Sequence, residues 1–280
     1  MRRVVSCYSN SFGPAGVRAA VEELAALGLG HVELALRPHD FGGLVIPESA
    51  VVTERTDEAT VAAFLELLRS SHVEVSGCNI GGGDLWTREG FEVIAGRLRF
   101  ASRVFGAKHA VTGASQPANA GQRAVVVDHL RELGDLAESL GVDLALETHQ
   151  GPTQNAQAML ALLGEVDHPR VRLNFDTGNI AYYNPGADPV AELEQVKHLV
   201  RSVHLKDNRG GFKDWYFPEI GDGGAVDFRK VREVLDGVGF VGPYTIELEG
   251  IGGEPEPGPE VRRERVARSL THLRSCGYFD

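Results

Sequence analysis

The sequence predicts an α/β protein in which residues 1–280 form a single closed barrel of eight strands and eight helices, a (β/α)8 barrel. The chain length of 280 residues is close to the roughly 250 that such a barrel needs. Short apolar runs alternate with longer amphipathic runs, and no linker interrupts the series. Strands separated by a helix pair in parallel, because a tight turn cannot connect parallel neighbours. A doubly wound open sheet is the alternative, although it usually has fewer strands and a glycine-rich first turn.

Eight short runs rich in β-branched residues are the predicted strands. They begin near Val4, His31, Val73, Lys108, Val142, Val171, Ser202 and Tyr244. Each interval between them has room for one helix and two loops. The two longest loops, residues 37–56 and 208–226, are expected to form the mouth of a site, because the loops that follow barrel strands build the active site of such folds.

The helices are predicted from their capping residues. Pro14 is expected to open the first helix, which ends by Gly28, and Gly141 is expected to end another in a left-handed conformation. The helix that follows Asp57 is expected to carry four apolar residues on one face: Val61, Phe64, Leu65 and Leu68. The remaining predicted boundaries are Asp188–Pro189 and Asp227 at helix starts, and a last helix from about Pro259 to Cys276.

The composition argues against several classes of protein. With 39 acidic and 28 basic residues the net charge is −11, which disfavours binding to nucleic acid or to an anionic membrane. No apolar run approaches the roughly 18 residues of a membrane span, and the N-terminus does not resemble a secretory signal. Three widely spaced cysteines make a disulfide framework or a zinc finger improbable. A soluble cytoplasmic protein is expected, and no nucleotide-binding glycine motif is present.

Four consecutive predicted strands each end in a residue that can bind a metal ion. These residues are Glu147, Asp176, His204 and Glu247. Taken singly, such a carboxylate is often a helix cap or a salt-bridge partner, and such a histidine can be a core residue. Neighbouring barrel strands bring their carboxyl ends to one place, so the pattern favours one shared site. Three carboxylates and one imidazole suit one divalent metal ion: Mn²⁺, Mg²⁺, Co²⁺ or Zn²⁺.

The same segments resemble the xylose isomerase-like TIM-barrel superfamily, in particular its sugar phosphate isomerase/epimerase branch. The resemblance covers nearly the whole chain and is carried by LALETHQGP, LNFDTGNIAYYNPGADP, VHLKDNRGG, IGDGGAVDF and TIELEG. It implies that the four strand-end residues bind one divalent metal, and that Glu147 and Glu247 are also the catalytic acid/base pair. One residue departs from the family pattern, because many relatives have histidine where this chain has Asn179. The substitution changes a contact to the substrate or to a second metal.

The predicted function is a metal-dependent isomerase or epimerase of a ketose or sugar phosphate. One glutamate removes the proton beside the carbonyl to give a metal-bound enediolate, and the other returns a proton. The alternative is a metal-dependent dehydratase of a keto-inositol or related polyol, in which a β-hydroxyl group leaves after the same abstraction. An endonuclease IV-like DNA repair enzyme is disfavoured, because it needs several more zinc ligands. The expected partner is a small sugar or polyol, and a homo-oligomer is compatible with the sequence.

Further residues are candidates for binding the substrate. They are His149, Lys206, Arg209, Asn79, Asn179 and Trp215. For Lys206 and Arg209 the alternative is a salt bridge with Asp207 or Asp214 at the rim. Aromatic side chains in the mouth loops can cover the C–H faces of a sugar or form a hydrophobic plug or a subunit contact: Trp86, Tyr182, Tyr183, Trp215, Tyr216 and Phe217. Glu33, within the second strand, is expected in a buried hydrogen-bond network rather than in catalysis.

Overall fold

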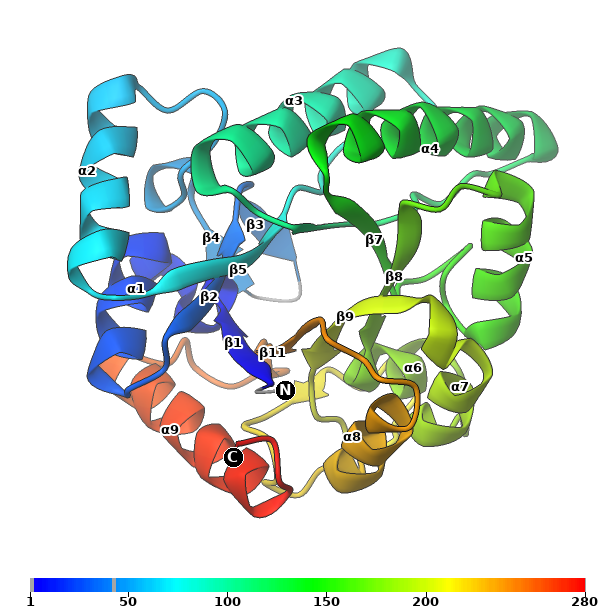
Figure 1. The fold of residues 1–280 in the computed structure, drawn as a ribbon. Helices are drawn as coiled ribbons and strands as arrows, with labels where there is room; N and C mark the ends of the chain where they lie inside the picture. The colour runs from blue at the N-terminus through cyan, green and yellow to red at the C-terminus, as the bar shows by residue number, and fades with distance from the viewer. Residues whose placement is uncertain (1–2, 42–43, 280) are drawn as a thin grey trace.

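The computed structural model describes residues 3–41 and 44–279, and it confirms the closed parallel barrel (Figure 1). Around the barrel the strands follow the order β1, β11, β9, β8, β7, β6, β5 and β2, with β2 pairing again with β1. The barrel strands are β1 (Val4–Tyr8), β2 (His31–Ala35), β5 (Glu74–Asn79), β6 (His109–Thr112), β7 (Asp143–Glu147), β8 (Val171–Asp176), β9 (Val200–Leu205) and β11 (Pro243–Ile246). All eight predicted strands therefore lie in one sheet, each beside its neighbour in sequence.

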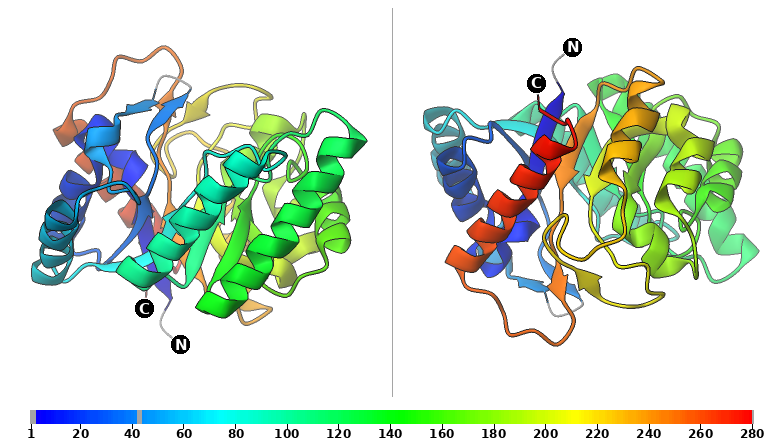
Figure 2. Two further views of the ribbon diagram at one scale, coloured as in Figure 1. Left: turned by 90° about the horizontal axis from the view of Figure 1, so that it is seen from above. Right: turned by 90° about the horizontal axis from the view of Figure 1, so that it is seen from below.

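Helices form the outer layer of the barrel (Figures 1 and 2). They are α1 (Gly16–Ala26), α2 (Glu58–Ser70), α3 (Arg88–Phe105), α4 (Ala120–Leu140), α5 (Ala156–Val166), α6 (Thr177–Tyr183), α7 (Pro189–Val196), α8 (Phe228–Asp236) and α9 (Pro259–Ser275). Asp57, Asp188 and Asp227 cap α2, α7 and α8 by accepting backbone N–H donors, as predicted. Gly141 ends α4 in the left-handed conformation, with φ of 67°.

The start of the first helix differs from the prediction. Pro14 lies inside a 3-10 helix, Ser9–Ala15, and α1 begins only at Gly16. The break arises because Gly13 and Gly16 both have positive φ, which interrupts a regular helix. A side chain at Gly16 would also place its Cβ 2.2 Å from the carbonyl oxygen of Ala50. The connection after β1 therefore turns tightly against the loop that precedes α2.

Two small antiparallel sheets lie in the long loops. The strands β3 (His39–Phe41) and β4 (Leu44–Ile46) pair in the loop that follows β2. The strand β10 (Tyr216–Phe217), in the loop after β9, pairs with β12 (Gly250–Ile251), which follows β11. Figure 2 shows the β3–β4 hairpin at the end of the barrel opposite the two chain termini. The prediction that these long loops build the mouth is confirmed, because both contribute residues to the cavity described below.

The barrel interior is polar, whereas the core lies between strands and helices. Ser6 of β1 and Ser76 of β5 share a hydrogen bond of 2.7 Å although β2 separates their strands, so both point into the barrel. Ser202 donates to Asn174 Oδ1 at 2.7 Å in the same interior. Alternate strand residues are apolar and fully buried in the core cluster, among them Leu146, Leu173 and Val203. Period-two alternation thus sends one set of side chains toward the helices and the other toward the barrel axis.

The three cysteines are free and buried: Cys7, Cys78 and Cys276. Within residues 3–41 and 44–279 no helix has the length and apolar character needed to cross a bilayer. The cytoplasmic location and the homo-oligomer remain predictions.

The apolar face of α2 is the predicted one for Val61, Phe64 and Leu68, but the prediction is wrong for Leu65. Phe64 is 0% exposed and Leu68 is buried, but Leu65 is 37% exposed. Leu67 packs against the core in its place. Each helical residue is rotated by about 100° from the previous one, so Leu65 turns away from the direction in which Phe64 points.

This difference predicts unequal effects of truncation in α2. Phe64→Ala is expected to lower the free energy of unfolding by about 3–5 kcal/mol, because it leaves a cavity in the core. Leu65→Ala, one residue further along, is expected to change it by less than about 1 kcal/mol. Urea-induced unfolding followed by circular dichroism measures both. Equal destabilisation by the two substitutions would contradict the orientation of the helix.

Candidate functional site

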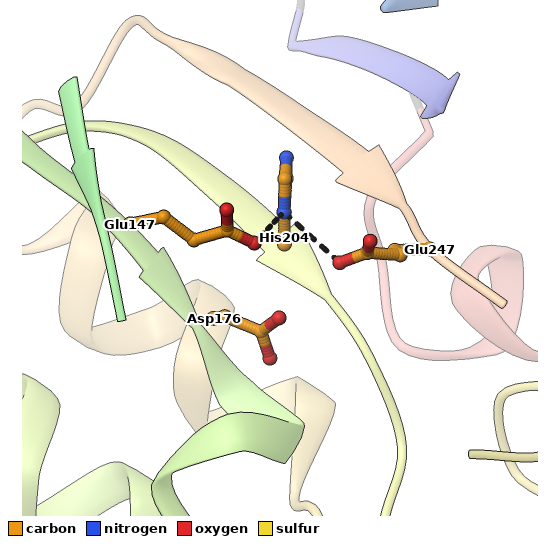
Figure 3. Close-up of side chains that lie close together, drawn as sticks. All are labelled: Glu147, Asp176, His204 and Glu247. Carbon is orange, nitrogen blue, oxygen red and sulfur yellow. Dashed lines mark hydrogen bonds and ion pairs between the residues drawn. The ribbon is translucent and has the colours of Figure 1, made fainter. Parts of the chain in front are cut away.

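The structure brings the four strand-end residues together at one end of the barrel. Glu147 and Asp176 are the last residues of β7 and β8, His204 is the penultimate residue of β9, and Glu247 directly follows β11. These strands are consecutive neighbours in the barrel. One ligand atom from each of the four residues lies within 4.8 Å of the others. Figure 3 shows Glu147 and Glu247 approaching the His204 imidazole from opposite sides.

Asp176 is oriented by the helix that follows it. Its Oδ1 accepts hydrogen bonds from the backbone N–H groups of Gly178 and Asn179, both at 2.9 Å, and so caps α6. Its own N–H donates to Thr148 Oγ1 at 3.0 Å. With Oδ1 occupied by the cap, Oδ2 is the carboxylate oxygen left for the cluster.

His204 is held between carboxylates on both of its ring nitrogens. Nε2 lies 3.0 Å from Glu33 Oε1, and Nδ1 lies 3.2 Å from Glu147 Oε1 and 3.0 Å from Glu247 Oε2. The ring also stacks on Tyr8, with centroids 5.6 Å apart. Glu33 is therefore in a buried hydrogen-bond network, as expected, and it orients the ring so that Nδ1 faces the cluster. Burial disfavours the imidazolium, but Glu33 and Glu247 together raise the pKa of His204 well above its usual value.

Lys206 faces the cluster and not the rim. Its Nζ lies 2.7 Å from Glu249 Oε2, 3.3 Å from Glu247 Oε2 and 3.5 Å from Asp176 Oδ2. The side chain is only 2% exposed, and Nζ also lies 4.6 Å from the centroid of the Phe217 ring. The alternative of a salt bridge with Asp207 or Asp214 is wrong for this lysine.

The acidic groups of the cluster and the adjacent Glu249 differ in the direction of their pKa shifts. Burial raises the pKa of Asp176 to about 8 and also raises the pKa of Glu249. For Glu247 burial acts in the same direction, but Lys206 and His204 outweigh it and hold the pKa of that carboxyl well below its usual range. For Glu147, burial is likewise outweighed by His204, which lowers its pKa.

The donor set fits a divalent cation. Asp176 Oδ2 and Glu247 Oε2 are buried, and the cationic groups beside them in the described part of the chain are Lys206 and, for Glu247, His204. Several carboxylates that face one another in a buried place repel, and a shared cation relieves that repulsion. Three carboxylates and one imidazole, with a further carboxylate on the second imidazole nitrogen, form a common ligand arrangement for such an ion.

A narrow inner cavity of about 50 Å³ lies against the cluster. It is lined by both glutamates of the cluster and by five of the six predicted substrate-binding residues: Asn79, His149, Asn179, Lys206 and Trp215. A wider outer cavity of about 550 Å³ shares part of this lining. His149 Nε2 lies 2.9 Å from the Tyr183 hydroxyl, and burial lowers the pKa of this histidine.

Arg209 is not in the inner cavity, so its prediction as a substrate-binding residue finds no support in the geometry. Its side chain is 54% exposed and forms an ion pair with Asp214, the alternative given above. Its guanidinium lies 4.4 Å from the Tyr216 ring centroid. The next residue, Gly210, adopts a positive φ of 88°, which marks a turn of the chain beside Arg209.

The aromatic side chains mostly gather at the inner cavity. Tyr182, Tyr183, Trp215 and Phe217 line it, whereas Trp86 lines the outer cavity and Tyr216 lies beside Arg209. Tyr182 packs against Phe217 with ring centroids 5.4 Å apart, and Trp215 against Phe217 at 5.2 Å. The two tyrosines belong to α6 and not to a loop.

Several lining residues were not among the candidates. Asn10 donates from Nδ2 to Glu247 Oε1 at 2.9 Å, and Glu249 pairs with Lys206. Arg37 and His39 come from the loop after β2. Of these, only Glu249 carries a sequence signal, because it stands two residues after Glu247 and so continues the alternation of its strand.

The contact between Glu33 and His204 yields a prediction about metal affinity. Glu33→Ala is expected to weaken Mn²⁺ binding about 10–100-fold, because the imidazole loses the acceptor that fixes its orientation. Glu33→Gln keeps an acceptor oxygen and is expected to lose less. Isothermal titration calorimetry measures both, with the exposed Glu74 on the neighbouring strand changed to Gln as control. Unaltered affinity in Glu33→Ala would contradict the role given to this carboxylate.

Comparison with known proteins agrees with the geometry. An inosose dehydratase from Geobacillus thermodenitrificans is 31% identical over 141 residues, which cover 45% of this chain and 46% of that protein. An L-ribulose-5-phosphate 3-epimerase from Salmonella paratyphi A is 33% identical over 152 residues, covering 54% and 51%. The chain thus spans about half the length of these curated relatives.

Solved structures match this chain over a larger share of its length than the curated sequences do. The crystal structure of a xylose isomerase-like TIM barrel protein from Mycobacterium smegmatis in complex with magnesium superposes with a TM-score of 0.73 at 18% identity, over 99% of both chains. The sequence model of the xylose isomerase-like TIM barrel family matches residues 21–276. The resemblance noted in the sequence is confirmed, and the chain belongs to the xylose isomerase-like TIM barrel family.

Proposed function

We propose that this protein is a divalent-metal-dependent isomerase or epimerase of a ketose or sugar phosphate. The observation that carries the proposal is the placement of Glu147 and Glu247 on opposite sides of the cluster (Figure 3). Two carboxylates so placed can serve opposite faces of one substrate carbon, which a single base cannot do. The similarity to an L-ribulose-5-phosphate 3-epimerase supports the same chemistry.

The metal would be held by Glu147, Asp176, His204 and Glu247. We propose one ion, with Mn²⁺, Mg²⁺, Co²⁺ and Zn²⁺ as candidates, and the magnesium complex of the mycobacterial relative supports a site of this kind. When bound, such an ion draws electron density from a carbonyl oxygen and so acidifies the adjacent C–H bond.

The side chains of the protein carry out the proton transfers. One glutamate accepts the proton from the carbon beside the carbonyl, and the other, when protonated, delivers a proton to the opposite face or to the neighbouring carbon. Asn10 and Lys206 hold Glu247 from two sides, so this carboxylate keeps a fixed direction. The inner cavity offers only about 50 Å³, and its aromatic wall suits the C–H faces of a sugar or polyol.

A dehydratase of a keto-inositol or related polyol is the second candidate. The observation that favours it is the contact between His149 and Tyr183 in the cavity wall, because a β-hydroxyl group needs a proton donor in order to leave as water. Similarity to an inosose dehydratase supports it as well. An endonuclease IV-like enzyme is less favoured, because residues 3–41 and 44–279 contain a single group of potential metal ligands.

Solvent deuterium distinguishes the two candidates. Metal-loaded protein incubated with a panel of ketoses and inosose in D₂O is expected to yield a product of unchanged carbon skeleton with deuterium at the reacting carbon, detected by mass spectrometry and NMR. Loss of one water molecule from the substrate would instead identify a dehydratase. Absence of both deuterium exchange and water loss across the panel would contradict proton abstraction altogether.

A substitution tests the catalytic pair. Glu247→Gln keeps the shape and one oxygen of the side chain but cannot accept a proton, so kcat is expected to fall by about 10²–10⁴. Metal binding is expected to be largely retained through the other three ligands, as measured by calorimetry. Glu219→Gln serves as control, because Glu219 is a mostly buried glutamate paired with Arg268 outside the cavity. Unchanged turnover in Glu247→Gln would rule out this assignment.

A further inference from the structure

Arg37 differs from the other cations near the site because no acidic residue of the described chain forms an ion pair with it. It follows β2, its side chain is half-buried, and its Nε donates to Asn79 Oδ1 at 3.2 Å. Lys206, by contrast, contacts three carboxylates. Within residues 3–41 and 44–279 the guanidinium of Arg37 forms one hydrogen bond, from Nε, and its two terminal nitrogens form none.

Polar and charged groups surround Arg37: Glu147 lines both cavities with it, Glu247 and Glu249 line the inner cavity, and Asp84 lines the outer one. His39 lies nearby, and burial together with the Arg37 charge lowers the pKa of this histidine to about 4, so it is neutral at pH 7. The side chain of Arg37 runs along the glycine turn that follows β5. A Cβ at Gly81 would lie 3.5 Å from Arg37 Nε, and one at Gly82 would lie 3.4 Å from Arg37 Cδ. A half-buried guanidinium whose terminal nitrogens contact no carboxylate directly can accept an anionic group of a ligand.

Arg37 stands where the two cavities meet. Together with Asn79, Glu147 and His149 it lines both the inner cavity beside the cluster and the outer cavity of about 550 Å³. A molecule whose carbonyl end reaches the cluster and whose other end enters the larger space would lie beside these four residues. The outer walls contain the turn of residues 81–83 and the segment 113–116, together with the side chains of Asp84, Trp86 and Gln150.

We propose that Arg37 binds an anionic group, a phosphate ester or a carboxylate, carried by the substrate at the end remote from its reacting carbonyl. A planar guanidinium with two free nitrogens can donate two parallel hydrogen bonds to such a group. The placement of the substrate carbonyl at the cluster rests on the proposed function. Arg37 would then select anionic substrates over neutral sugars, with its Nε held in place by Asn79.

A competing explanation is that Arg37 only offsets the negative charge of the carboxylate cluster. In that case its removal would affect neutral and anionic ligands alike. Polyols separate the two explanations, because they lack a carbonyl group and cannot be turned over. Binding of ribitol, ribitol 5-phosphate and ribonate to the Mn²⁺-loaded protein can be measured by calorimetry whether or not the isomerase proposal holds.

The wild-type protein is expected to bind at least one of the two anions about tenfold or more tightly than ribitol. Arg37→Gln is expected to remove this preference while ribitol affinity stays within about twofold. Arg37→Lys keeps the positive charge but not the two parallel N–H donors, so it is expected to retain part of the preference for the anion. Arg69→Gln, at an exposed arginine of α2 paired with Glu66, is the matched control and should behave as wild type. Thermal unfolding verifies that each variant is folded.

The outcomes are distinguishable. Preference for ribitol 5-phosphate identifies a phosphate ester as the bound group, and preference for ribonate identifies a carboxylate. The proposal is overturned if neither anion is preferred, if the preference survives in Arg37→Gln, or if that variant weakens ribitol and both anions equally. If the preference for an anion depends on Arg37 but the protein shows no deuterium exchange, the anion site is supported and only the proposed reaction is rejected.

Discussion

The repulsion among buried carboxylates is the constraint on which the rest of the site depends. Glu33, Glu147, Asp176, Glu247 and Glu249 all lie inside one end of the barrel, and among the described residues only His204 and Lys206 oppose them by direct ion pairs. Burying an acid without a compensating charge costs several kcal/mol, so this arrangement is stable only if cations or protons share the space. A divalent ion would reduce that cost, which links the proposed cofactor to the stability of the barrel as well as to its chemistry.

The barrel supplies the geometry that this constraint requires. Parallel strands end at the same edge, so single residues on β7, β8, β9 and β11 reach one another without any local motif. The polar interior continues below them through hydrogen bonds such as those of Ser6 with Ser76 and Ser202 with Asn174. Because these bonds satisfy buried polar groups, they hold the strand ends in place. The side chains of the cluster therefore start from fixed backbone positions.

The sequence predicted the barrel and the cluster because both follow from period-two alternation, which fixes the side to which a strand residue points. It failed where direction depends on a turn. Arg209 and Arg37 both lie in loops beyond strand ends, yet Arg209 points to the surface and Arg37 to the cavity. Leu65 was assigned to the wrong face because helical positions one residue apart diverge by about 100°. Asn10 lies in an irregular 3-10 segment, where no simple periodicity applies.

The short ladder between β10 and β12 ties two separate loops into one unit. Phe217 pairs with Gly250, and Gly250 follows directly after Glu249, the partner of Lys206. The ring of Phe217 also contacts the Lys206 ammonium. A change in the length of either loop would therefore displace both an aromatic side chain of the cavity and a charge beside the cluster. Divergence of substrate preference along this edge therefore requires coordinated changes in two distant stretches of the sequence.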